Sequence, residues 1–125
     1  MYASVADLIE RFGETEIVEL TDLEHTGAVD NAMAEQALTD ATAEIDGYLA
    51  ARYRLPVTDT PRLLSLLCTD IARYRLQKGV STEQARQRYE DAVARLKAIA
   101  RGEINLPLDT PPPTSAEPKM VTGSG

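Results

Sequence analysis

Arginine and tyrosine recur together in this chain, and both side chains are suited to binding. The string Ala-Arg-Tyr-Arg-Leu occurs twice, at residues 51–55 and 72–76, and Arg88-Tyr89 adds a third pair. Guanidinium groups bind phosphates and tyrosine rings stack on bases, which is the chemistry of a nucleic-acid surface. The same two residue types are also enriched at protein–protein interfaces. The pattern is therefore compatible with two kinds of partner.

Charge and periodicity favour a protein partner over a nucleic acid. The formal net charge is −7, which opposes general attraction to phosphates. Tyr53, Tyr74 and Tyr89 also fall on the apolar faces of predicted helices, so we expect their rings in the core or at its rim. Arginines near helix C-termini are stabilised by the helix dipole. The predicted contacts to neighbouring copies or another protein are Arg52, Tyr53, Arg54, Arg73, Tyr74 and Arg75.

No catalytic or cofactor motif is present in the sequence. It contains no GxGxxG, GxxxxGK[ST], HExxH or CxxC pattern. His25 is the only histidine and has no cysteine beside it, so we expect it to be solvated in a loop rather than bound to a metal. Cys68 is the only cysteine, which excludes an internal disulfide, and its apolar neighbours predict that it is buried. We expect neither enzymatic activity nor a cofactor.

The middle of the chain has helical periodicity in two stretches separated by a turn with prolines. Apolar residues recur at three- and four-residue steps from residue 30 to 54 and again from Pro61 to Gly79. Neither apolar face is stable in water, so we expect the two helices to pack as an antiparallel pair. A third long helix begins at Ser81 and ends at Gly102. The apolar positions are Leu38, Ala41, Ile45, Tyr48, Leu49 and Tyr53; Leu63, Leu64, Leu67, Ile71 and Tyr74; and Ala85, Tyr89, Ala92, Val93, Leu96, Ile99 and Ala100.

Two short helices are predicted before this bundle and an extended tail after it. Ser4 and Asp7 form a capping-box pattern for the first helix, which we expect to end at Gly13, and residues 14–20 predict the second. Beyond the third long helix, prolines and small residues predict a polyproline-like or disordered segment. The predicted fold is all-α: a small bundle of three long helices and one or two short ones. The helical domain spans residues 1–109 and the proline-rich tail spans 110–125.

The charges are strongly segregated along the chain. Residues 1–50 hold twelve acids and one base, a net of −11, whereas residues 51–101 hold eleven bases and five acids, a net of +6. Either these halves pair within one monomer, or the acidic side of one copy meets the basic side of the next. The second arrangement is heterologous and produces a ring or a filament. No stretch is long and apolar enough for a membrane span or resembles a signal peptide, so we expect a cytoplasmic product.

Several strings resemble the small head–tail proteins of Mu-like phages and prophages. The resemblance covers about residues 1–109, in order, and its agreement over several strings makes it specific. The strings lie at residues 1–3, 7–13, 43–56, 70–76, 88–92, 96–102 and 106–109.

The resemblance implies a head–tail connector, or adaptor, with no catalytic role. Such a protein forms a ring beneath the portal, matches its twelve-fold symmetry, extends the DNA channel and offers a platform to the next head-completion or tail protein. DNA passes through the lumen without specific binding, and an acidic lumen would let it slide. The implied location is the virion, with host cytoplasm during assembly and no membrane association.

The resemblance also implies a role for the C-terminal tail. In such adaptors a C-terminal extension reaches into the portal, although the tail from Thr110 lies outside the matching strings. The sequence leaves open whether the tail docks on the portal or on a neighbouring copy. The residues predicted to make the contact are Leu108, Pro111, Pro112, Pro113, Pro118, Lys119, Met120 and Val121.

A small helical DNA-binding or packaging accessory protein is the alternative. A steep salt dependence of DNA affinity would favour it, because counterions released from DNA set that slope.

Overall fold

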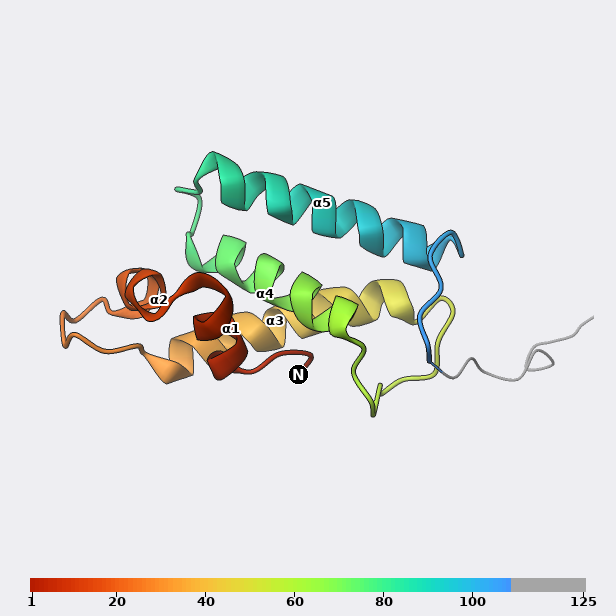
Figure 1. Ribbon diagram of the computed structural model, residues 1–125, viewed down its shortest axis with the longest axis horizontal. Helices are drawn as coiled ribbons and strands as arrows, with labels where there is room; N and C mark the ends of the chain where they lie inside the picture. The colour runs from red at the N-terminus through yellow and green to blue at the C-terminus, as the bar shows by residue number, and fades with distance from the viewer. Residues whose placement is uncertain (109–125) are drawn as a thin grey trace, which may run out of the picture.

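The computed structural model describes residues 1–108, which form five α-helices and no strand (Figure 1). The predicted all-α fold, with three long helices after two short ones, is confirmed. The predicted tail residues beyond Leu108 lie outside the described residues. The helices are α1 (Val5–Phe12), α2 (Glu14–Thr21), α3 (Asn31–Leu49), α4 (Arg62–Leu76) and α5 (Glu83–Ala100).

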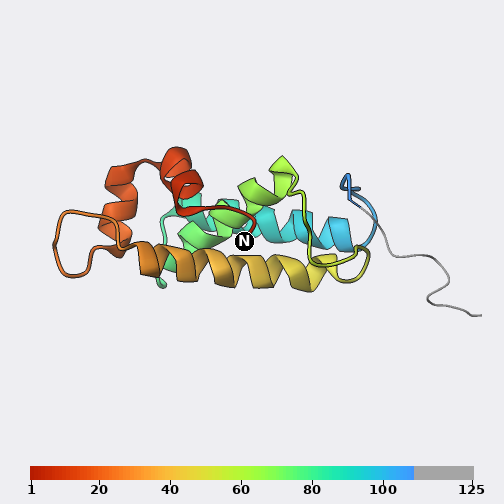
Figure 2. The same cartoon turned by 90° about the horizontal axis from the view of Figure 1, so that it is seen from below.

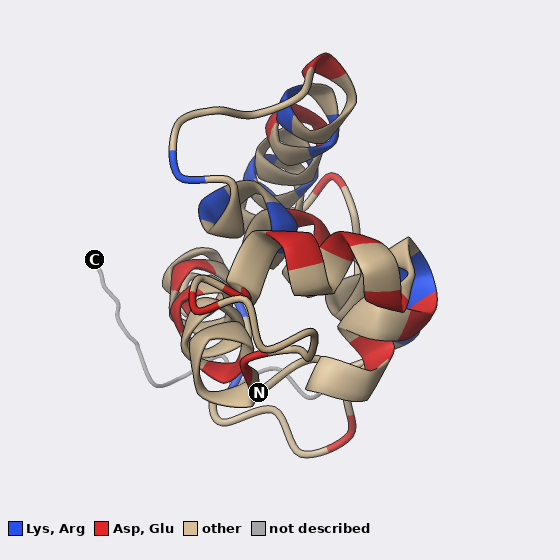
Figure 3. Ribbon diagram, turned by 90° about the vertical axis from the view of Figure 1, so that its left-hand side faces the viewer, with Lys and Arg blue, Asp and Glu red and all other residues tan. Residues whose placement is uncertain are grey.

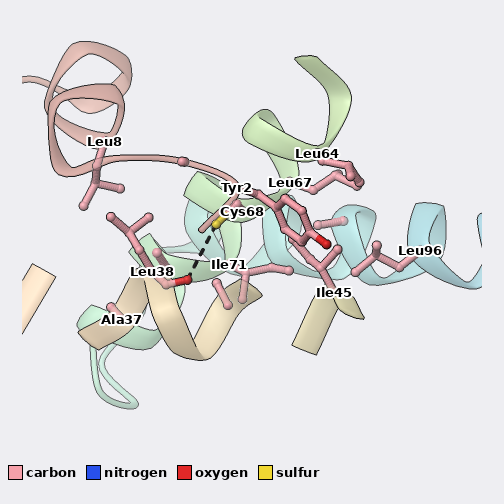
Figure 4. Packing of buried hydrophobic residues seen from close by; sticks show 14 of the residues in the cluster. Tyr2, Leu8, Ala37, Leu38, Ile45, Leu64, Leu67, Cys68, Ile71 and Leu96 are labelled. Carbon is pink, nitrogen blue, oxygen red and sulfur yellow. Dashed lines mark hydrogen bonds between the residues drawn. The ribbon is translucent and has the colours of Figure 1, made fainter. Parts of the chain in front are cut away.

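Helix α4 is the centre of the bundle. It packs against both α3 and α5, and it runs antiparallel to each (Figure 1). The predicted hairpin of the first two long helices is therefore present. Figure 4 shows the apolar side chains that fill the space between these helices, and burying each large one contributes about 1.5–3 kcal/mol. The fully buried residues include Leu38, Ile45 and Leu49 of α3, Leu64, Cys68 and Ile71 of α4, and Leu96 and Ile99 of α5.

The single cysteine is part of this core, as expected. Cys68 is fully buried, and its thiol donates a hydrogen bond to the carbonyl of Leu38 at 3.8 Å. Burial raises the pKa of the thiol, because a thiolate is poorly solvated there.

The N-terminal helices α1 and α2 lie over the N-terminal half of α3 and the C-terminal half of α4 (Figure 2). The predicted capping box is present, since Ser4 accepts from the backbone N–H of Asp7 while the Asp7 carboxylate accepts from the N–H of Ser4. Gly13 ends α1 and begins α2 with a φ of 92°, a value that side chains with a Cβ rarely adopt. Tyr2 precedes α1, is 7 % exposed and donates its hydroxyl proton to Asp46.

Four predicted helix boundaries were wrong, including the end of the second long helix, which lies at Leu76 and not at Lys78-Gly79. The first long helix ends at Leu49 rather than Arg54, because the chain turns there and carries Tyr53 into the core. Helix α4 begins one residue later than predicted, with Pro61 as its N-cap. Helix α5 is capped by Thr82 instead of Ser81, since the Thr82 hydroxyl accepts from the N–H of Ala85 at 3.1 Å.

Candidate interaction surfaces

The repeated string contains two Arg-Tyr-Arg triplets, residues 52–54 and 73–75. The first arginine of the first triplet, Arg52, binds the end of α5. Its guanidinium donates to the carbonyls of Ile99 and Ile104 at 3.1 and 3.3 Å and to the side-chain oxygen of Asn105 at 2.8 Å. Carbonyls at a helix C-terminus lack partners within the helix and carry partial negative charge, so a cation is stabilised there. Arg52 therefore joins the turn after α3 to the C-terminal segment.

The other two members of this triplet have opposite environments. Tyr53 is 3 % exposed, and its hydroxyl accepts from the buried N–H of Leu106 at 2.8 Å. Arg54 is exposed and lines a shallow pocket of about 300 Å³ with Val57 and Leu108. Leu108 is half-buried there; the other residues of the predicted tail contact lie beyond the described part of the chain.

The second triplet lies in the last turns of α4, and its first arginine is buried. The guanidinium of Arg73 makes a bidentate pair with the carboxylate of Glu16 on α2, at 2.6 and 3.2 Å. It also lies 4.3 Å from the centre of the Phe12 ring. Bidentate pairing and an aromatic contact are both suited to the flat guanidinium group. Arg73 therefore attaches α1 and α2 to α4.

Tyr74 and Arg75 face a different neighbourhood, between α3 and α5. The Tyr74 ring stacks on Tyr89 of α5 with centroids 4.2 Å apart. Arg75 pairs with Glu44 of α3, and the Tyr89 hydroxyl donates to the same carboxylate at 3.1 Å. Burial and the Glu44 charge raise the pKa of Tyr89. The hydrogen bond to Glu44 raises the pKa of Arg75, whose side chain remains 44 % exposed.

A groove between α2 and the α4–α5 loop was not predicted from the sequence. It has a volume of about 730 Å³ and contains Leu23 and Val80 from two loops, with Phe12, Leu20 and Leu76 behind them. We call this feature the α2 groove. Leu23 and Val80 lie outside the helical periodicity, and their apolar character in loops was the signal that could have identified it.

The sequence reasoning also missed a charged cluster beneath α1. Arg11, the only base of the acidic half, pairs with Asp70 of α4 at 3.0 Å and donates to the hydroxyl of Thr69 at 2.8 Å. Burial raises the pKa of Asp70, while Arg11 and Arg88 oppose that shift. Arg11 thus serves the packing of α1.

Folding neutralises a small part of the charge segregation. Glu16 and Glu44 are the acids of residues 1–50 that pair with bases of α4 in the described structure, through Arg73 and Arg75. Figure 3 shows mostly acidic residues on the helical turns below α5, and most basic residues on or next to α5. The exposed acids of residues 1–50 are Glu10, Glu14, Glu19, Glu24, Asp30, Glu35 and Asp40, and the exposed bases of residues 51–108 are Arg54, Arg62, Arg75, Lys78, Arg95, Lys97 and Arg101. The separation is partial, because Asp59, Glu83, Glu90, Asp91 and Glu103 are exposed among these bases.

Two further observations concern ligands and membranes. Within residues 1–108, no three His, Cys, Asp or Glu side chains lie close enough together to hold a metal ion, and His25 is exposed in its loop. Over the same range, every helix is too short or too polar to span a bilayer.

The fold and these surfaces define a small all-α protein whose notable groups are exposed charges and an apolar groove. A family model described as Bacteriophage Mu, Gp36 matches residues 2–122. The Mu-like prophage FluMu protein gp36 of Haemophilus influenzae is 40 % identical over 108 residues, covering 86 % of this chain and 77 % of the relative. Gene product J of Escherichia phage Mu is 40 % identical over 119 residues, covering 94 % of this chain and 83 % of the relative.

The chain therefore belongs to the Gp36 family of phage Mu and Mu-like prophages. The resemblance to Mu-like phage proteins is confirmed at the level of the family.

Proposed function

We propose that this protein is a structural virion protein, a head–tail adaptor that forms a ring beneath the portal and extends the DNA channel. Membership in a phage Mu family supports a role in the virion or in its assembly in the infected host cell. The observation that carries the ring is the separation of charge on the folded surface. Its partners are the portal, the neighbouring copies and the next head-completion or tail protein.

Separation of the charges on the surface favours head-to-tail contacts between identical copies that all have the same orientation. An acidic surface of one copy attracts the basic surface of the next, whereas like surfaces repel. A heterologous contact of this kind closes into a ring when the rotation between copies allows it. The exposed third arginines of the two triplets, Arg54 and Arg75, are the members best placed for such contacts. Arg52, Tyr53 and Arg73 are buried or half-buried with partners inside the monomer. Arg75 also pairs with Glu44 of the same chain, but its side chain is 44 % exposed.

Native mass spectrometry of the purified protein, alone and mixed with its portal, tests the proposal. We expect a portal-bound ring with the portal's twelve-fold stoichiometry. A ring without portal would also support it, because charge complementarity would then suffice for closure. A monomer that ignores the portal but binds DNA with a steep salt dependence would refute it and support a DNA-binding accessory protein.

A pair of charge reversals locates the contact. Arg54→Glu with Arg75→Glu is expected to weaken ring formation on the portal at least about tenfold, since each contact then brings like charges together. Lys97→Glu with Arg101→Glu makes the same change in net charge at the end of α5, within the basic surface but at residues that the sequence did not predict as contacts, and serves as the comparison. Equal loss in both variants would show a general charge effect instead of a contact at Arg54 and Arg75.

A further inference from the structure

The α2 groove concentrates exposed apolar surface at one end of the molecule. Among residues 1–108, the large hydrophobic side chains that are exposed are Met1, Leu23 and Val80, at 59, 63 and 86 %. Two of these three line the groove. Apolar side chains that gather on a soluble protein's surface around a concave site are typical of a binding site for another chain.

We propose that the α2 groove of one copy binds the end of the C-terminal tail, residues 117–121, of a second copy. Met120 and Val121 are the only large apolar residues after Leu108, and they complement Leu23 and Val80. Lys119 complements the exposed carboxylate of Glu19, and Glu117 complements Lys78 on the opposite rim.

Distance favours a second copy over the chain's own tail. Leu108 lies past the C-terminal end of α5, while the groove lies at the N-terminal end of that helix (Figure 1). Helix α5 has 18 residues and is about 27 Å long. The eleven residues from 109 to 119 reach about 35 Å when fully extended. Binding to the chain's own groove would use nearly that whole reach around the molecule, whereas a copy beside Leu108 imposes no such extension.

This inference rests on the proposed ring and specifies which segments form one of the contacts between neighbouring copies. The contact is heterologous, since a groove meets a tail, and it therefore repeats from copy to copy. It assigns Pro118, Lys119, Met120 and Val121, four of the residues predicted for the portal contact, to a neighbouring copy instead. Leu108 and Pro111–Pro113 are left for the portal.

Cross-linking between two differently labelled copies tests the contact. Val80→Cys protein is mixed with Met120→Cys protein and treated with a short bismaleimide, both without portal and with it. Cys68 is fully buried and does not compete. Binding holds the two new thiols at high effective concentration, so we expect about tenfold more covalent heterodimer than in the control. The matched control replaces Val80→Cys by Ala28→Cys, which is exposed at the same end of the molecule but outside the groove.

The outcomes separate this inference from the proposed function. Cross-linking at Val80 but not at Ala28 supports the contact, even if the portal is not bound. A portal-bound ring without the cross-link would overturn the inference and leave the adaptor function standing. Absence of the cross-link from both samples also overturns it. In the double variant Val80→Cys with Met120→Cys, products linked only within one chain would show that the tail binds its own groove.

Discussion

Arg52 and Arg73 begin identical triplets, and both guanidiniums are bonded within the monomer, but to different chemical groups. Arg52 binds neutral carbonyls at the end of α5, whereas Arg73 binds a carboxylate on α2. The middle tyrosines differ as well: Tyr53 is buried with its hydroxyl bonded to the backbone, while Tyr74 stacks at the rim on Tyr89. An identical string therefore does not identify an identical site.

The physical reason is the position of each triplet relative to its helix. The second triplet is helical, and successive helical residues point about 100° apart, so Arg73 faces α2 while Arg75 faces α3. The first triplet lies in the turn after Leu49 and has no helical direction to follow. In both, the third arginine remains exposed. The comparison predicts that the first residue of each triplet serves stability and the third is available to partners.

The largest effect is expected for Arg73→Ala. This change leaves Glu16 without its partner in a site where the arginine is 9 % and the glutamate 29 % exposed. Removing one partner of a mostly buried pair costs about 3 kcal/mol, because the remaining charge stays poorly solvated. Urea denaturation measures the loss in the free energy of unfolding.

Arg75→Ala is the matched control for this prediction. It removes the same side chain from the same helix, but the arginine is 44 % exposed, and the Glu44 carboxylate left behind, 17 % exposed, keeps the hydrogen bond from Tyr89. A smaller loss of about 1 kcal/mol is therefore expected. Equal losses of stability in the two variants would contradict the conclusion that Arg73 stabilises the fold more than Arg75 does. A loss of assembly in Arg73→Glu protein would for this reason be uninformative about contacts between copies, whereas the same test at Arg75 is interpretable.

A smaller effect is expected for Tyr53→Phe. The change removes the acceptor of the buried Leu106 N–H, which costs about 1–2 kcal/mol. Hydrogen exchange of the Leu106 amide should accelerate together with the decrease in stability. Tyr74→Phe keeps the ring that stacks on Tyr89 and should change stability by less than about 0.5 kcal/mol. Unchanged Leu106 exchange in the Tyr53 variant would show that the hydroxyl does not hold the C-terminal segment.

The sequence was sufficient to predict the bundle because its core residues recur at helical spacing along the chain. Leu38, Ile45 and Ile71 recur at helical spacing, and all three are fully buried where predicted. The end of α3 was missed because the periodicity continues to Tyr53, which is indeed buried, although the chain reaches the core there through a turn.

The candidate surfaces depend on contacts between distant residues and were less accessible from the sequence. Glu16 and Arg73 are 57 positions apart, and neither residue indicates its partner. The α2 groove forms only when the loops containing Leu23 and Val80 lie side by side after folding. The order of charged residues along the chain predicted that the charges are segregated, but only the fold shows which of them remain exposed.

The smallest predicted effect is on the pH dependence of stability. It distinguishes the surroundings of Arg75 from those of Arg54, the third residues of the two triplets. The folded pKa of Tyr89 is raised, so above pH of about 10 the unfolded chain releases a proton that the folded chain keeps. Stability therefore falls as pH rises through that range. Burial is the first cause of the shift and the Glu44 charge the second, so Glu44→Gln should lower the pKa of Tyr89 and make the decrease less steep.

The difference should be a fraction of a kcal/mol, because Tyr89 is partly exposed and solvent screens its interaction with Glu44. Urea denaturation over a series of alkaline pH values measures the slope, and the difference in tyrosinate absorbance between wild type and Tyr89→Phe follows the titration itself. Arg54→Gln is the control, since it removes the exposed charge of the first triplet far from Tyr89 and should leave the slope unchanged. If Glu44→Gln and Arg54→Gln alter the slope equally, the loss of stability at alkaline pH reflects the overall charge of the protein. In that case Arg75, Glu44 and Tyr89 are not a coupled cluster, and the two triplets do not differ in this respect.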